Sequence, residues 1–134
     1  MSKSKKSKRG GSSEPEPDEI YDFPLLQEAA GKVAQEALAR VLEGQRFHPA
    51  KVAEWTDLVC QETLAGLRGL SRGLKFAVSC LVFQKGAEGE GVAEAAPLAT
   101  TVCGHWDPAR DGALSLRWEN ASIGCLLVVS GYAL

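Results

Sequence analysis

The sequence predicts an α+β domain in which two N-terminal helices pack on a four-stranded antiparallel sheet. Two observations lead to this fold class. Apolar residues recur at three- and four-residue steps from Phe23 onward, which is the period of a helix. After Gly73 the apolar residues alternate with other residues, or run almost without interruption, as they do in strands. Helices followed by strands are typical of a layout in which the helices cover one face of the sheet.

A tail of residues 1–20 precedes the domain, which we place at residues 21–134. Basic residues come first in this tail and acidic ones follow: Lys3, Lys5, Lys6, Lys8 and Arg9, then Glu14, Glu16, Asp18 and Glu19. The tail has too few apolar residues to offset the entropy lost on ordering, so we expect it to be disordered. We interpret it as a solvated leash. A contact with acidic surfaces, such as tubulin tails or nucleic acid, and a nuclear signal are the alternatives.

The composition is that of a soluble globular protein. The chain has 134 residues, 45% of them hydrophobic, which suits one domain with a continuous core. No apolar stretch approaches the roughly 20 residues that cross a bilayer, and no apolar segment follows the basic N-terminus as in a signal peptide. The cysteines form no CxxC pair, so we expect reduced core thiols in an intracellular protein at Cys60, Cys80, Cys103 and Cys125.

The two helices have clear start and stop signals. The first runs from Phe23 to near Glu43, and Gly44 can adopt the left-handed conformation that ends it. The second begins at Pro49, where a missing N–H costs nothing, and His48 is interpreted as a residue of the helix entry and not as a ligand. Three glycines loosen the end of the second helix, at Gly66, Gly69 and Gly73.

The second half of the chain predicts strands separated by turns. The expected strands are residues 74–84, about Leu98 to Trp106, residues 113–118 and residues 123–132. A solvated loop from Gly86 to Pro97 separates the first two, and an Asp-Gly turn at residues 107–112 separates the next two. The last strand is almost entirely apolar, so we expect it to be central in the sheet.

Several short motifs occur together in one order. They are Lys51-Val52-Ala53-Glu54-Trp55-Thr56, Leu74-Lys75-Phe76, Phe83-Gln84-Lys85, His105-Trp106-Asp107 with Asp111-Gly112, and Arg117-Trp118-Glu119-Asn120. Each motif is weak alone, but the order and spacing make the combination specific. On these residues the chain resembles the Tctex-type dynein light chains over residues 23–134.

The resemblance implies a strand-swapped dimer, either a homodimer or a heterodimer with a related Tctex-type light chain. In such a dimer the strand from about Leu98 to Trp106 joins the other subunit's sheet, and dynein intermediate chains dock as an added strand. A long loop permits the crossing, because doubling a flexible loop costs only about 0.6 kcal/mol in closure entropy. The implied partner and dimer interface comprises Thr100, Thr101, Val102, Cys103, Gly104, His105, Trp106 and Trp55.

The sequence departs from the usual family pattern at two places. The loop at residues 86–99 is longer than is typical, and Cys103-Gly104-His105 stands where small or aromatic residues are more common. Glycine weakens a strand, yet it also lets another backbone come close. We therefore expect this light chain to differ from its relatives in the affinity or choice of partner.

The chemistry of the sequence does not indicate an enzyme. Cys103 and His105, with the other cysteines, could in principle bind zinc, but the spacing of a zinc site is missing. A Cys103 nucleophile paired with His105 would lack a carboxylate to orient the base. The glycines of the loop do not precede a helix with a Lys-Ser/Thr end, so nucleotide binding is unsupported. We expect no catalysis, metal or cofactor, and neither nucleic acid nor a membrane as partner.

The expected function is that of a non-catalytic light chain of a dynein motor complex. In this role the dimer binds dynein intermediate chains and supports assembly and cargo or axonemal attachment. The alternative is a dynein-independent dimeric adaptor that links cargo or signalling proteins. The expected location is the cytoplasm and cytoskeleton, in the axoneme of a cilium or flagellum; composition does not separate cytoplasmic from axonemal dynein.

Overall fold

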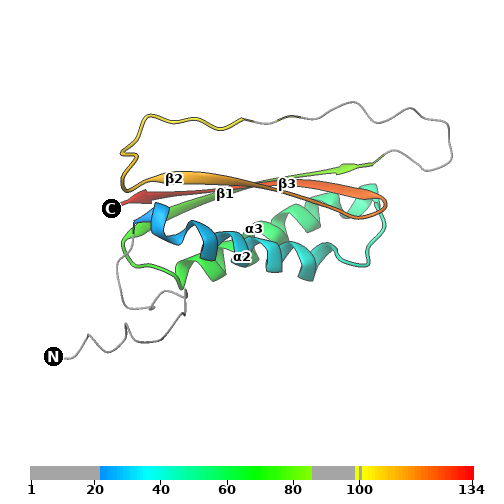
Figure 1. The fold of residues 1–134 in the computed structure, drawn as a ribbon. Coiled ribbons are helices and arrows are strands. Elements are labelled where there is room, and N and C mark those ends of the chain that lie inside the picture. The colour runs from blue at the N-terminus through cyan, green and yellow to red at the C-terminus, as the bar shows by residue number, and fades with distance from the viewer. Residues whose placement is uncertain (1–21, 86–98, 100) are drawn as a thin grey trace.

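The fold consists of a helix layer on one face of an antiparallel sheet (Figure 1). The computed structural model describes residues 22–85, 99 and 101–134. Helices α2 (Phe23–Leu42) and α3 (Val52–Arg68) form the layer, with a short 3-10 turn η1 (Pro49–Lys51) directly before α3. The strands are β1 (Leu74–Gln84), β2 (Gly112–Glu119) and β3 (Ile123–Ala133), in the spatial order β1-β3-β2. The predicted α+β class, with two helices on a sheet, is confirmed.

The helix boundaries follow from the residues that the sequence singles out. Gly44 has φ +83°, a conformation that glycine adopts without steric cost, directly after the capping residue Glu43 at the end of α2. At the second entry, Nδ1 of His48 accepts a hydrogen bond from the Ala50 N–H at 3.3 Å. His48 therefore caps the turn that leads into α3, as predicted, and this turn is 3-10 before it becomes α-helical.

The apolar strand β3 is the central strand, as predicted. It pairs with β1 on one side, where Leu127 faces Cys80, and with β2 on the other, where Leu127 faces Leu116. Both edges of β3 are paired and its residues 123–131 are buried on both faces, which explains the almost continuous run of apolar residues. The observed bounds of β1 equal the predicted ones, β2 is one residue longer at each end than predicted, and β3 is one residue longer at its C-terminal end.

The predicted strand from about Leu98 to Trp106 is not part of the sheet. Within the described residues the sheet has three strands, and residues 99 and 101–106 have no strand pairing. A β-strand needs a neighbour for its backbone N–H and C=O groups, and no other described segment of this chain supplies one here. Leu98 and Thr100 themselves, like the predicted tail at residues 1–20 and the loop from Gly86 to Pro97, lie outside the described residues.

The hydrophobic core lies between the helices and the sheet. Leu26 and Leu38 of α2, Val59 of α3 and Leu127 of β3 are almost completely buried there. Trp55 belongs to this core, and Trp118 packs against it from β2. None of the helices in the described part of the chain is long and apolar enough to cross a membrane.

Candidate partner-binding site

The predicted interface segment runs along the sheet face opposite to the helices (Figure 1). Thr101, Val102, Cys103 and His105 are exposed in this chain, and Trp106 is partly buried. The Trp106 ring meets the Tyr132 ring edge to face, with centroids 5.7 Å apart and an interplanar angle of 63°. Trp106 therefore connects this segment to the sheet, through Tyr132 near the C-terminal end of β3.

Gly104 is required here by the Trp106 ring. A Cβ atom at Gly104 would lie 2.6 Å from Cε3 and 2.7 Å from Cζ3 of Trp106. Within this chain, the group that approaches the Gly104 backbone is thus an aromatic side chain of the same segment. A larger residue at this position would displace the ring that contacts Tyr132.

The other predicted interface residues lie in different places. Trp55 has only 4% of its surface exposed and lies in the core, on the face of α3 that packs toward the sheet. Thr100 lies outside the described residues. Cys103 is exposed, so the prediction of a core thiol is wrong at this position, because the segment that carries it is not packed inside the sheet. The interface role of the whole set stays a prediction.

The remaining thiols lie between α3 and the sheet. The sulfurs of Cys80 and Cys125 are 3.6 Å apart, and the Cys60 thiol donates to the carbonyl oxygen of Val78 at 3.8 Å. Burial raises the pKa of Cys60 above the ordinary value. The hydrogen bond with Cys125, and then burial, raise the pKa of Cys80, so the Cys60 and Cys80 thiols stay protonated at neutral pH. The described residues contain no cluster of His, Cys, Asp and Glu that could hold a metal ion.

The sheet face opposite to the helices carries an apolar surface that sequence reasoning had not identified. Leu81 of β1 is 47% exposed there, beside Leu126 and Val128 of β3, which are 7% and 9% exposed. Val102, in the interface segment, is 45% exposed. Exposed apolar surface of this kind is typical of protein–protein contact. Period-two alternation in residues 75–83 could have indicated it, because Ala77, Ser79, Leu81 and Phe83 share one face.

Strand β2 has a free edge. Its pairing continues to a hydrogen bond from the Asn120 N–H to the Ile123 oxygen at 2.9 Å, so the even-numbered residues of β2 bond to β3. The odd-numbered residues therefore direct their backbone N–H and C=O groups away from the sheet: Ala113, Ser115, Arg117 and Glu119. No hydrogen bond from another described residue reaches these backbone groups. An added strand could pair with them.

Strand β1 forms the other edge, and it differs from β2. The Lys85 N–H bonds to the Ser122 oxygen at 3.0 Å, so the odd-numbered residues of β1 bond to β3 and the even-numbered ones face outward. The outward carbonyl of Val78 accepts the Cys60 thiol from α3. The helix layer therefore supplies a partner to the β1 edge, which it does not do for β2 among the described residues.

Asn120 joins the far end of the sheet to the helix layer. Its Oδ1 accepts hydrogen bonds from the backbone N–H groups of Ser122 and Ile123 at 2.9 and 2.8 Å. Its Nδ2 donates to the backbone carbonyl oxygen of Gln45 at 2.9 Å. Nζ of Lys85 also donates to the backbone carbonyl oxygen of Asn120 at 3.1 Å and forms an ion pair with Glu119 at 3.0 Å. The sequence motifs at residues 83–85 and 117–120 thus meet in one structural network.

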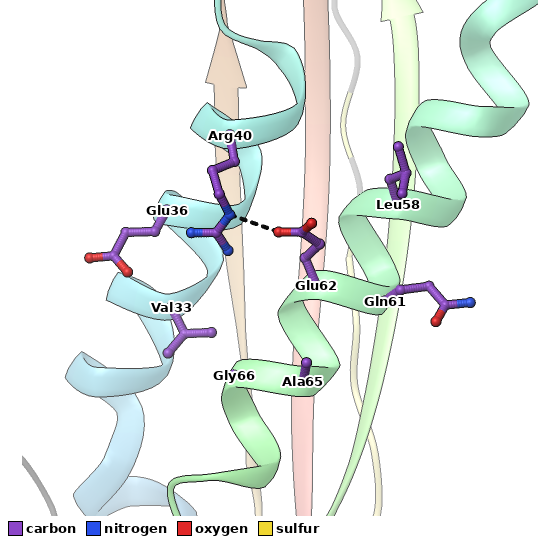
Figure 2. A pocket seen from close by; sticks show the side chains of 8 residues that line it. All are labelled: Val33, Glu36, Arg40, Leu58, Gln61, Glu62, Ala65 and Gly66. Atoms are coloured by element: carbon purple, nitrogen blue, oxygen red, sulfur yellow. Dashed lines mark hydrogen bonds and ion pairs between the residues drawn. The ribbon is translucent and has the colours of Figure 1, made fainter.

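A groove lies between the outer faces of α2 and α3 (Figure 2). It has a volume of about 490 Å³, and Val33, Leu58, Glu36 and Gln61 are among its lining residues. The ion pair between Arg40 and Glu62, at 2.7 Å, crosses it (Figure 2). The helices approach closely at one end, where a Cβ on Gly66 would lie 2.5 Å from Val33 Cγ1. This groove belongs to the helix layer and is separate from the sheet face that carries Trp106.

Comparisons with known proteins agree with this geometry. The Tctex-1 family profile matches residues 24–132. The chain is 31% identical over 111 residues to a Dictyostelium discoideum protein named "Dynein light chain Tctex-type", covering 82% of this chain and 93% of the relative. It is 29% identical over 107 residues to the Homo sapiens "Dynein light chain Tctex-type 3", covering 80% and 85%.

A Drosophila melanogaster protein named "Dynein light chain Tctex-type" is 28% identical over 116 residues, covering 87% of this chain and 97% of the relative. The match therefore extends over nearly the full length of each relative and over both helices and all described strands. The resemblance predicted from the sequence motifs is confirmed. The chain belongs to the Tctex-1 family.

Proposed function

We propose that the chain is a non-catalytic, dimeric light chain of a dynein motor complex, which binds dynein intermediate chains. Its relatives carry the name of dynein light chain. The observation that carries the proposal is the combination of a free β2 edge with an unpaired extended segment before β2. Among the described residues the β2 edge has unpaired backbone N–H and C=O groups, and so does the segment before β2, so the edge of one chain and the segment of another can satisfy each other's hydrogen bonds.

In the proposed dimer, residues 98–106 of each chain pair along the β2 edge of the partner subunit and complete a four-stranded sheet. The outward backbone groups of Ser115 and Arg117 would then bond to the exchanged strand. The sheet faces that carry Leu81 and Leu126 would face the partner, so the exposed apolar surface would be buried. The partner is a second copy or a related Tctex-type chain, with Thr100, Thr101, Val102, Cys103, Gly104, His105 and Trp106 as the proposed interface set; Trp55, buried in the core, would support this set only from within the protomer.

The intermediate chain would add as a further extended strand. The exchanged strand becomes the new edge of the sheet, and an extended peptide can bond to its backbone while alternate side chains enter pockets. Trp106 is the large anchor in this strand, since aromatic residues contribute most to such contacts. The unusual Cys103-Gly104-His105 would select among intermediate-chain sequences, because the Cys103 and His105 side chains are exposed near Trp106.

A binding assay tests the groove. The full chain is incubated with an immobilised extended peptide from a dynein intermediate chain, and the Trp106→Ala variant is compared with the wild type. We expect a loss of affinity of about 30-fold or more, as for a central aromatic residue worth at least ~2 kcal/mol. Leu58→Ala is the control, because Leu58 is an exposed apolar residue of the helix layer. Equal binding by Trp106→Ala and the wild type would place the peptide elsewhere.

The motor assignment needs a test on the native protein. Sedimentation of a native extract should show the chain together with dynein heavy chains, and purification of that complex should identify the intermediate chains and the paired light chain. We expect the complex in the cytoplasm and cytoskeleton and, for a ciliary dynein, in the axoneme, where it would support assembly and attachment. Migration only with small complexes would indicate the alternative, a dynein-independent adaptor for cargo or signalling proteins.

A further inference from the structure

The turn between the unpaired segment and β2 is fixed by one carboxylate. Oδ1 of Asp111 accepts the Ala133 N–H at 2.6 Å, and Oδ2 accepts the Asp107 N–H at 3.0 Å. The backbone carbonyl oxygen of Asp107 in turn accepts hydrogen bonds from the backbone N–H groups of Arg110 and Asp111, at 3.0 and 2.8 Å. The turn is therefore closed on itself and also bonded to the end of β3.

The same turn is attached to the start of the helix layer. The Phe23 N–H donates to the Arg110 oxygen at 2.9 Å, and Nε of Arg110 pairs with Oδ1 of Asp22 at 3.2 Å. The Phe23 ring packs against Gly112 and Gly131, where an added Cβ would lie 2.8 and 2.5 Å from it. Helix α2, strand β2 and strand β3 thus meet at one point, from which the unpaired segment leaves.

Residues 101–106, which precede the turn, do not take the path of a hairpin strand. A turn of this length commonly joins two strands of a hairpin, and the β2 edge next to it is free. Residues 101–106 nevertheless do not pair with β2; they run over the sheet face, where Trp106 contacts Tyr132. The bonds of Asp111 hold the turn in the orientation that produces this path, and they leave the β2 edge open to another chain.

We propose that Asp111 is a positioning residue for strand exchange: it holds the 107–111 turn so that the preceding segment does not fold back onto its own β2. This inference rests on the proposed dimer. Asp111 touches no partner in this role and acts through the direction of the chain before it. Without its carboxylate the turn can close a hairpin within one chain, and that hairpin occupies the edge that the partner's strand requires.

The test compares Asp111→Ala with Asn120→Ala in the full chain. Each variant removes one side chain that accepts two backbone N–H groups at one end of the sheet. Sedimentation equilibrium gives the dimer dissociation constant, and thermal unfolding gives the stability of the fold. We expect both variants to lower the melting temperature, but only Asp111→Ala to raise the dissociation constant, by about tenfold or more, as for one lost charge-assisted hydrogen bond.

The outcomes separate the inference from the proposed function. A wild-type chain that sediments as a monomer with every Tctex-type partner contradicts the dimer itself. A wild-type dimer with an unchanged constant in Asp111→Ala, or with an equal increase in both variants, contradicts only the positioning role. Should Asp111→Ala fail to fold, Asp111→Asn keeps the size of the side chain and is measured instead. Failure of both to fold would assign Asp111 to the fold of the protomer and overturn the inference.

Discussion

The two ends of the sheet are held by the same kind of bond but by different side chains. At one end Asp111 accepts the N–H groups of Asp107 and Ala133, and at the other Asn120 accepts those of Ser122 and Ile123. Asp111 is an acid whose bonds depend on its charge, whereas Asn120 is neutral and also donates to Gln45. The comparison indicates that the acceptor at the Asp111 end titrates, whereas the acceptor at the β2–β3 hairpin does not and has its charges beside it, in the Lys85–Glu119 ion pair.

Replacing Phe23 should have the largest effect, at the Asp111 end. Phe23 is 1% exposed and fills the space above Gly112 and Gly131, so Phe23→Ala leaves a cavity. We expect a loss of about 3–5 kcal/mol in the free energy of unfolding, measured by urea denaturation. Phe47→Ala, at the Asn120 end, is the matched variant and should cost less, because Phe47 is only partly buried. An equal loss in both variants would show that the two ends depend equally on their aromatic residues.

Removing Asn120 tests the neutral end. Asn120→Ala leaves the Ser122 and Ile123 N–H groups without their acceptor, and the Gln45 oxygen loses its donor. We expect a loss of about 1–3 kcal/mol in the free energy of unfolding. Asn120→Asp keeps the acceptor oxygens and should recover part of the loss. A loss in Asn120→Ala that varied between pH 7 and 5 would contradict the view that the bonds of the Asn120 side chain do not depend on a titrating group.

Gly44 tests the connection that Asn120 holds. Its φ of +83° disfavours any residue with a Cβ, so Gly44→Ala should lower the free energy of unfolding by about 1 kcal/mol. Gly31→Ala is the matched control, because Gly31 lies within α2 and has nothing within 4 Å of an added Cβ. The control should stabilise the fold by up to about 1 kcal/mol through helix propensity. The same change in sign and size at both positions would refute the role of the left-handed turn.

The pH dependence of Asp111 should be the smallest effect and the most specific. The bonds from the Ala133 and Asp107 N–H groups lower the pKa of Asp111 below its ordinary value. A lowered pKa means that the carboxylate stabilises the fold above the unfolded-state pKa, and this contribution is lost as the pH falls through the folded-state pKa. Unfolding followed from pH 7 into the acid range should therefore show a loss that is smaller in Asp111→Asn. If the stability of the wild type and that of Asp111→Asn fell in parallel as the pH was lowered, the stabilising role of the Asp111 carboxylate would be contradicted.

Much of the fold could be predicted from the sequence because its signals are local. Gly44 and Pro49 mark the boundary of the helices by their own backbone preferences, and the apolar run at residues 123–132 requires a central position. The strand at residues 98–106 could not be placed in this way. Its residues have strand propensity, but pairing depends on where the preceding turn directs them, and in this chain the described residues 101–106 do not pair with the β2 edge.

The candidate site was predicted only in part, for a related reason. Trp106 was singled out for the interface, a role that stays a prediction; its contact with Tyr132 and the bonds of Asp111 and Asn120 were not anticipated. Asp111 reaches Ala133 and Asn120 reaches Gln45, which are distant in the sequence, so no local pattern reports these bonds. Trp55 could be read equally as core or interface from its type, and only the packing of α3 shows that it is buried.

The unequal edges of the sheet bear on how large an assembly can become. A sheet with two open edges can add strands at both and grow into a fibre, whereas one open edge per molecule stops growth at a closed pair. In this chain the Cys60 thiol engages the outward carbonyl of Val78 on β1, while the outward groups of β2 have no described partner. The helix layer thus engages one outward group of β1 and none of the described outward groups of β2, so an added strand meets less competition at the β2 edge.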